Sequence, residues 1–107
     1  MVVKRGDVWR VALGAAAGKR PYDAPACVVF SPPEMHDFLS TVIVAPLTRS
    51  GKPAPFRIAL RFGGEAGLIL LDQIRALDRS RLVARLGAIN PATLRASLGA
   101  LQRVFAP

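Results

Sequence analysis

The sequence predicts a mainly β domain that ends in one amphipathic helix, and two observations carry this prediction. Short apolar or alternating runs recur along most of the chain, separated by turns that contain Gly and Pro. After Asn90, leucines follow one another at helical spacing instead. Curled antiparallel sheets of this length close into a small barrel or pack face to face. We therefore expect about six short antiparallel strands in one of these arrangements.

Three runs in the first half predict strands. RGDVWRVAL (residues 5–13) alternates between two sets of side chains, and ACVVF (26–30) is a short apolar run typical of a buried strand. TVIVAPLT (41–48) is β-branched and apolar, which predicts a central strand with Pro46 at its irregular end. The residues between these runs predict a long exposed loop over 14–25 and one helical turn within 32–40.

The second half continues the pattern. FRIALRF (56–62) alternates, which places its phenylalanines, Ile58 and Leu60 on one face. GLILLDQIRAL (67–77) predicts a strand that runs into another through Asp72 and Gln73. SRLVARLGAI (80–89) is a weaker pattern that fits a helical turn followed by a short strand.

The last segment is the clearest helix. Asn90 is a favourable N-cap, and Pro91 suits the first helical position. One apolar stripe then predicts a face packed on the core, formed by Leu94, Leu98, Leu101 and Phe105.

Length and hydropathy indicate one domain over residues 1–107. The chain has 107 residues and is 51% hydrophobic, enough for a single core. It contains no run of 18 apolar residues, and its first residues turn charged at once, so we expect no membrane segment, no signal peptide and a cytoplasmic location.

The charge is strongly positive. The chain has fifteen Lys and Arg residues and seven Asp and Glu residues, which gives a formal net charge of +8. Twelve of the fifteen basic residues are arginine. No acidic residue follows Asp78. This charge fits either a solvated basic face or a polyanionic partner, such as a nucleic acid or an acidic protein.

The titratable residues predict neither a metal nor a cofactor. A single His, a single Cys and scattered carboxylates form no cluster with ligand spacing. Cys27 lies in an apolar run and is expected to be a buried, inert thiol. His36 is expected to be an exposed loop residue, although a catalytic triad would have to use it.

Polar and basic residues gather where the strand 41–48 meets the following loop. Thr48, Arg49, Ser50 and Lys52 provide two hydroxyls, a guanidinium and an ammonium within five residues. Such groups can hold a phosphate, although they are also common in ordinary turns.

Taken in order, RGDVW, PACVVFSP, VIVAPLT, LLDQIRALDRSRL and the final helix resemble the MazF/PemK (Kid) family of toxin–antitoxin endoribonucleases. The resemblance spans Arg5 to about Phe105. It implies a small SH3-like barrel of the CcdB/PemK type that works as a homodimer. It further implies metal-independent, sequence-selective cleavage of single-stranded RNA, with the 2′-OH as nucleophile, and inhibition by the acidic tail of a cognate antitoxin.

The same resemblance implies site residues. The family has a Thr at the end of the third strand, which corresponds to Thr48, and a DQ pair that corresponds to Asp72 and Gln73. The Asp is a proposed acid/base group in some members, whereas the alternative is a buried Asp-Gln pair that bonds the backbone. The family also has Arg-Pro before the second strand. Here that position holds Ala24-Pro25 or Pro25-Ala26, and the Arg-Pro occurs earlier, at Arg20-Pro21.

Three accounts of this displaced arginine stay open: the loop folds back so that Arg20 or Lys19 returns to the site, Arg49 replaces it, or catalysis is weak or absent. In the first account Arg20 holds the phosphate, Thr48 orients it, and the general base is Asp72, His36 or a water. The residues expected to bind substrate are Lys19, Arg49, Ser50, Lys52, His36 and Gln73.

Two other functions are compatible with the residues. The first is a non-cleaving member of the same fold that binds an antitoxin, gyrase or RNA. The second is a general RNA-binding or ribosome-associated module, which ranks last because the chain offers few aromatic residues for base stacking.

Overall fold

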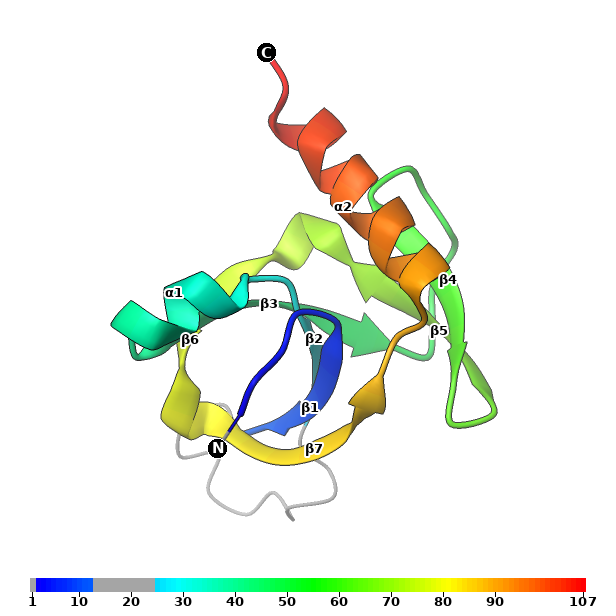
Figure 1. Cartoon of the computed structure of the whole chain (residues 1–107). Coiled ribbons are helices and arrows are strands. Elements are labelled where there is room, and N and C mark those ends of the chain that lie inside the picture. The colour runs from blue at the N-terminus through cyan, green and yellow to red at the C-terminus, as the bar shows by residue number, and fades with distance from the viewer. Residues whose placement is uncertain (1, 13–24) are drawn as a thin grey trace.

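The computed structural model describes residues 2–12 and 25–107, which form a curled antiparallel sheet with a helix packed across it (Figure 1). The predicted mainly β fold is confirmed, with seven strands in place of about six, because the weaker pattern over 80–89 forms a full strand over residues 82–88. The strands are β1 (Asp7–Val11), β2 (Ala26–Val29), β3 (Thr41–Thr48), β4 (Arg57–Phe62), β5 (Glu65–Leu70), β6 (Arg75–Asp78) and β7 (Leu82–Ala88). The helices are α1 (Pro33–Phe38), α2 (Pro91–Phe105) and the single turns η2 (Leu71–Gln73) and η3 (Arg79–Arg81). The loop predicted over 14–25 falls mostly outside the described residues.

Strand β3 organises the sheet because it pairs with three other strands. Strand β2 lies along one edge, while the other edge is divided between β6, opposite residues 41–44, and β5, opposite residues 47 and 48. Pro46 therefore does not end the strand as predicted. It lies within β3 at the change of partner, where neither β6 nor β5 pairs with it.

The sheet curls but does not close through hydrogen bonds, which differs from the predicted barrel. The strand order is β4-β5-β3-β2-β1-β7, with β6 paired to β3 off this path, so β4 and β7 are the two ends of the path among the described strands. The ring of Phe62 bridges these two ends. A Cβ on Gly87 of β7 would lie 3.1 Å from the ring of Phe62 of β4. Phe62 therefore packs against the backbone of β7, and packing completes the barrel-like wall.

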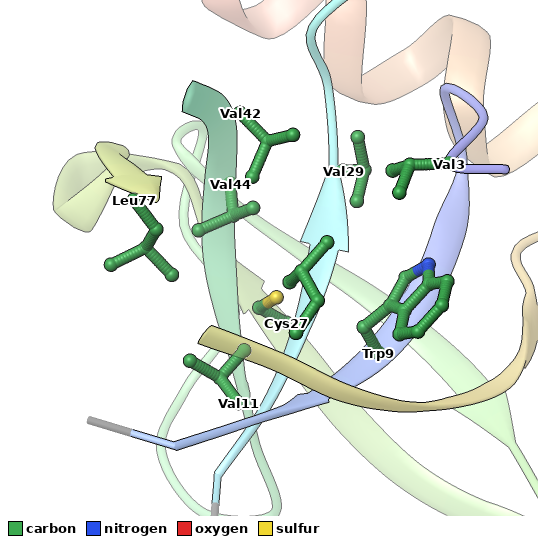
Figure 2. Packing of buried hydrophobic residues seen from close by; sticks show 9 residues of the cluster. Val3, Trp9, Val11, Cys27, Val29, Val42, Val44 and Leu77 are labelled. Carbon is green, nitrogen blue, oxygen red and sulfur yellow. The ribbon is translucent and has the colours of Figure 1, made fainter. Parts of the chain in front are cut away.

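Two apolar clusters fill the interior. In the first, side chains of β1, β2, β3 and β6 converge around Trp9 and Cys27 (Figure 2). The second lies on the opposite face of these strands and includes Ile69, Leu71 and Leu101. The predicted face of β4 is confirmed for Ile58, Leu60 and Phe62, which all pack against this second cluster, whereas Phe56 lies before the strand and is exposed.

Helix α2 begins as the sequence predicts. The side chain of Asn90 accepts a 2.8 Å hydrogen bond from the backbone N–H of Thr93, and Pro91 occupies the first turn. Leu94, Leu98 and Leu101 pack on the core, but Phe105 is 70% exposed. The expectation that Phe105 packs on the core is wrong because the last turn of α2 projects past the sheet (Figure 1).

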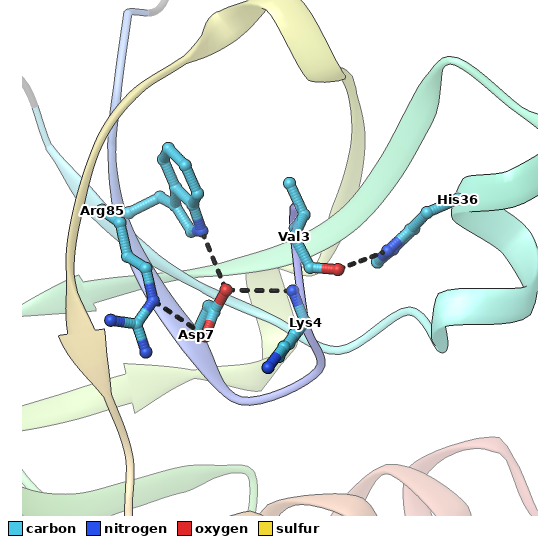
Figure 3. Close-up of polar contacts among 6 residues, drawn as sticks. Val3, Lys4, Asp7, His36 and Arg85 are labelled. Carbon is cyan, nitrogen blue, oxygen red and sulfur yellow. Dashed lines mark hydrogen bonds and ion pairs between the residues drawn. The ribbon is translucent and has the colours of Figure 1, made fainter. Parts of the chain in front are cut away.

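A buried carboxylate joins the N-terminal segment to the two neighbouring strands. Asp7 is only 2% exposed, and it accepts hydrogen bonds from the backbone N–H of Lys4 at 2.9 Å and the indole of Trp9 at 3.3 Å. Arg85 of β7 pairs with its other oxygen at 3.2 Å (Figure 3). The GDVW sequence is thus explained by structure, because Asp7 and Trp9 fix β1 in place.

Candidate functional site

A groove of about 500 Å³ lies between the end of β3 and the β4–β5 hairpin. Its lining is about equally polar and apolar, and its polar groups include the Thr48 hydroxyl, the guanidinium groups of Arg10 and Arg49, and the Glu65 carboxylate. This combination is typical of ligand sites, in which a small number of polar groups orient what the apolar walls cover. The lining residues are Arg10, Pro25, Ala26, Leu47, Thr48, Arg49, Leu60, Phe62, Gly63, Glu65, Ala66, Gly67 and Leu86.

The predicted residues after β3 form a tight turn at the edge of this groove. Thr48 Oγ1 accepts a 3.3 Å hydrogen bond from the backbone N–H of Ser50. Gly51 allows the turn because its φ of 113° is a conformation that side-chain-bearing residues rarely adopt. The turn leaves Ser50 and Lys52 exposed beside the Thr48 hydroxyl.

The backbone of Thr48 is held from behind by β5. A Cβ on Gly67 would lie 2.9 Å from the carbonyl oxygen of Thr48, closer than any real side chain approaches. Gly67 therefore lets β5 pack directly against the end of β3, and this contact fixes the position of the Thr48 backbone at the groove.

Arg49 is engaged by a carboxylate of the groove. Its Nε lies 2.7 Å from Glu65 Oε2, and the two side chains are 82% and 53% exposed. Solvent-exposed ion pairs contribute little to stability and exchange readily. An anionic ligand in the groove can therefore replace Glu65 as the partner of Arg49.

Asp72 forms a bidentate ion pair with Arg57. Arg57 Nε donates to Asp72 Oδ1 at 3.1 Å, and Arg57 Nη2 donates to Asp72 Oδ2 at 3.0 Å. The hydrogen bond from Arg57 holds the pKa of the Asp72 carboxyl below its usual value. The alternative of a buried Asp-Gln pair bonded to the backbone is wrong, because both residues are exposed and Asp72 pairs with a side chain. Arg57 Nη1 lies 3.9 Å from where a Cβ on Gly51 would be, so this pair borders the turn after Thr48.

Gln73 lines a second, smaller hollow of about 280 Å³ together with Arg75. The two hollows share Pro25 and Ala26 in their linings. Thr48 and Gln73 are therefore brought to the two sides of the segment that begins β2.

His36 is not the exposed loop residue that was expected. It lies in α1, where Nδ1 donates to the carbonyl of Val3 at 3.0 Å (Figure 3). Its Nε2 is 2.7 Å from Ser31 Oγ. Because a carbonyl only accepts, these partners place the proton on Nδ1 and leave Nε2 to accept from Ser31. Nδ1 thus ties α1 to the N-terminal segment, and Nε2 ties it to Ser31, just before the helix begins.

The prediction for Cys27 is confirmed. It is buried, and burial raises the pKa of its thiol to about 12. The thiol therefore stays protonated at neutral pH and is a poor nucleophile.

Lys19 and Arg20 lie outside the described residues. Arg10, by contrast, was missed as a site residue, although it lines the groove from β1. The available signal was a charged residue within a strand whose neighbours, Trp9 and Val11, are both buried.

The described part of the chain has neither a metal-binding cluster nor a membrane-spanning helix. No three His, Cys, Asp or Glu side chains there are grouped so that they could hold a metal ion. None of its helices combines the length and the apolar character needed to cross a membrane.

A family profile matches residues 4–105 and describes a PemK-like, MazF-like toxin of type II toxin–antitoxin systems. The chain belongs to this family. The toxin is also similar to an endoribonuclease from a mycobacterial species in complex with its cognate antitoxin, at 25% identity and a TM-score of 0.82, covering 99% of this chain and 98% of that one. It resembles MazF from Deinococcus radiodurans at 26% identity and a TM-score of 0.76, over 97% and 96% of the two chains. The MazE-MazF complex from that organism matches at 25% identity and a TM-score of 0.77, with the same coverage.

Proposed function

We propose that this toxin is an endoribonuclease that cleaves single-stranded RNA at preferred sequences and acts in the cytoplasm. The observation that carries the proposal is the groove at the end of β3, where one hydroxyl and two guanidinium groups lie beside apolar side chains and a single carboxylate. Membership of the toxin family and similarity to a named endoribonuclease support the same activity. The net charge of +8 favours a polyanionic substrate.

The reaction we propose uses the substrate's own nucleophile. The 2′-oxygen bonds to phosphorus, the bond from phosphorus to the 5′-oxygen breaks, and the products are a 2′,3′-cyclic phosphate and a 5′-OH. One proton leaves the 2′-OH, and one is delivered to the 5′-oxygen. The nucleophile is already tethered beside the phosphorus, so the enzyme contributes orientation and stabilises charge on the phosphate. No metal-bound water is required as a nucleophile.

Within this proposal Thr48 orients the scissile phosphate through its hydroxyl. Arg49, Ser50 and Lys52 lie in the same turn and bind neighbouring backbone phosphates. Arg20, which lies outside the described residues, remains the predicted phosphate-binding arginine, with Lys19 next to it in the sequence. Gln73 lines the adjacent hollow and suits contact with a neighbouring nucleotide.

Asp72 is the candidate general base. Its lowered pKa keeps it ionised at neutral pH, so it can accept a proton but has none to donate as an acid. His36 is a weaker candidate, because both of its ring nitrogens are bonded within the protein.

We also propose an acidic-tailed antitoxin and a second copy of the chain as partners. The antitoxin follows from the toxin family and from similarity to MazE-MazF complexes. An acidic tail suits the same cationic groups as RNA. A homodimer would cover apolar side chains that are exposed here, including Phe105 at 70% and Val104 at 47%.

The experiment is cleavage of a long mixed-sequence RNA by purified protein in EDTA, with cleavage sites and end groups mapped. We expect cyclic phosphate ends, and for Thr48→Val a loss of about 100-fold, the usual cost of removing one preorganised donor. Thr48→Ser keeps the hydroxyl and should stay within a few-fold of the parent. A parent protein that leaves the RNA intact would refute the activity. An active Thr48→Val would refute only the assigned site.

The base can be tested separately through Arg57. Replacing it by Gln removes the hydrogen bond that lowers the pKa of Asp72, so that pKa should rise towards the ordinary value of about 3.9. If Asp72 is the base, the acidic limb of the kcat/KM profile moves to higher pH in Arg57→Gln and Asp72→Asn loses activity throughout. An unchanged limb in a folded variant would remove Asp72 from the mechanism.

A further inference from the structure

We propose that Arg10 supplies a guanidinium that binds an RNA phosphate in the groove beside Thr48. This inference rests on the proposed ribonuclease function and adds a phosphate-binding residue to its site. It starts from the lining of the groove, in which Arg10 is the single charged residue contributed by β1 among those described.

The register of three strands brings Arg10 to this end of the sheet. Arg10 pairs with Ala26 across β1 and β2. Cys27 pairs with Pro46 across β2 and β3, and continuing that register by one residue places Ala26 opposite Leu47. Cross-strand partners point to the same face of a sheet, so Arg10 and Leu47 flank Ala26 on the groove side. Thr48 directly follows Leu47.

The small size of Ala26, which lies between Arg10 and Leu47, leaves room for the Arg10 side chain. Two strand spacings separate β1 from β3, roughly 10 Å between backbones. Ala26 carries only a methyl group, which leaves the space above it open for the long side chain of Arg10. Pro25 and Ala26, the residues at the start of β2, line the groove but carry no charge of their own.

Arg10 is also better fixed than the other arginine of the groove. Strand β1 is paired with β2 on one side and β7 on the other, so the backbone of Arg10 is held from both sides (Figure 1). Irregularities in the β1–β7 pairing occur next to Arg10, and such bulges often redirect a side chain beside a site. Arg49 lies instead in an exposed turn and pairs with Glu65.

The electrostatics favour the same assignment. Glu65 neutralises Arg49, whereas no described residue holds the Arg10 guanidinium through a hydrogen bond or ion pair. Arg10 is half-buried, so water screens it less than a surface arginine. A planar guanidinium binds two phosphate oxygens at once, which suits a site that must orient a phosphate.

The test uses the full-length protein with Arg10→Gln, Arg10→Lys and, as a charge-matched control, Arg95→Ala on the exposed face of α2. One assay measures cleavage of the mixed-sequence RNA. A second measures binding of a short single-stranded oligodeoxynucleotide, which has the same phosphates and no 2′-OH, over a range of salt. Unfolding midpoints establish whether each variant is folded. If Arg10→Gln does not fold, the comparison between Arg10→Lys and the parent decides the test.

We expect Arg10→Gln to lower cleavage by tens of times or more and to reduce the slope of log K against log salt by about 0.7, the value for one lost contact to a single strand. Arg10→Lys should recover binding better than cleavage, because an ammonium keeps the charge without the planar fork. Arg95→Ala should match the parent in both assays.

Equal cleavage and equal salt slope in the parent and Arg10→Gln would overturn the inference while leaving the ribonuclease intact. If the parent itself fails to cleave, the proposed function fails, and the oligodeoxynucleotide slope still decides whether Arg10 binds phosphate. The same variants are also tested for binding to a Glu-rich peptide. If Arg10→Gln loses binding to this peptide but binds the oligodeoxynucleotide as the parent does, the inference is also overturned, since Arg10 would then serve a protein partner.

Discussion

Gly67 of β5 lies so close to Thr48 of β3 that a Cβ on Gly67 would be 2.9 Å from the Thr48 carbonyl oxygen. The φ angle of Gly67 is not in the left-handed region, so the glycine is required by space and not by backbone conformation. The position of the Thr48 hydroxyl in the groove therefore depends on the absence of a side chain on the neighbouring strand.

Gly67→Ala should move Thr48 and lower RNA cleavage by about tenfold or more, because small displacements of catalytic groups are costly. The overpacking should also cost about 1–3 kcal/mol of unfolding free energy. The measurements are kcat/KM on a mapped RNA site and urea unfolding. Gly64→Asn is the control, since a Cβ there meets nothing within 4 Å and Asn tolerates the φ of 79°. Normal cleavage by Gly67→Ala would show that Thr48 does not need this support.

Glu65→Gln should increase affinity for single-stranded RNA several-fold at low salt, because it removes the carboxylate that competes with phosphate for Arg49. The gain should shrink as salt rises. The measurement is a salt series of binding constants. Glu34→Gln removes the same charge from the exposed surface of α1 and should change affinity much less. An equal gain in both variants would mean that only net charge matters.

The ion pair of Asp72 with Arg57 should make stability depend on pH in the acid range. The pKa of Asp72 is lower in the folded protein than in the unfolded chain. Its contribution to stability is therefore present above the unfolded value of about 3.9 and is lost as pH falls through the folded value. We expect the parent to lose more thermal stability than Asp72→Asn between neutral pH and strong acid. Parallel curves for the two proteins would contradict the pair's contribution.

Asp7→Ala should destabilise the fold by about 3 kcal/mol, because it leaves the buried donors of Lys4 and Trp9 without an acceptor and Arg85 without its partner. Urea unfolding followed by Trp9 fluorescence measures the change. Asp37→Ala, on the exposed surface of α1, should stay within about 0.5 kcal/mol of the parent. A small effect at Asp7 would mean that water reaches these donors.

Local patterns were sufficient for most of the fold. Alternation and apolar runs located the strands, and Asn90 with Pro91 located the start of α2, because caps and strand periodicity act over a few residues. The last turn of α2 was misjudged at Phe105. A stripe in the sequence shows which face is apolar, but not how far the sheet beneath it extends.

The site was only partly predictable. Thr48 and Arg49 could be named as candidates because they adjoin a recognisable strand end, and Asp72 because it belongs to a DQ pair like that of the family. His36 was misplaced, since its partners Val3 and Ser31 come from other segments. The partner of Asp72 lies 15 residues away, so nothing in its neighbourhood marked it as an ion pair.

By itself, the sequence determined the class of fold, the basic character and the resemblance to a toxin family, because composition, periodicity and motif order are all properties of the linear chain. The tertiary structure decided which residues meet. Arg10, Thr48 and Glu65 come from three strands, and only the register of β1 with β2, of β2 with β3 and of β3 with β5 brings them to one groove. Strand pairing acts over long sequence separations, and no local pattern specifies it.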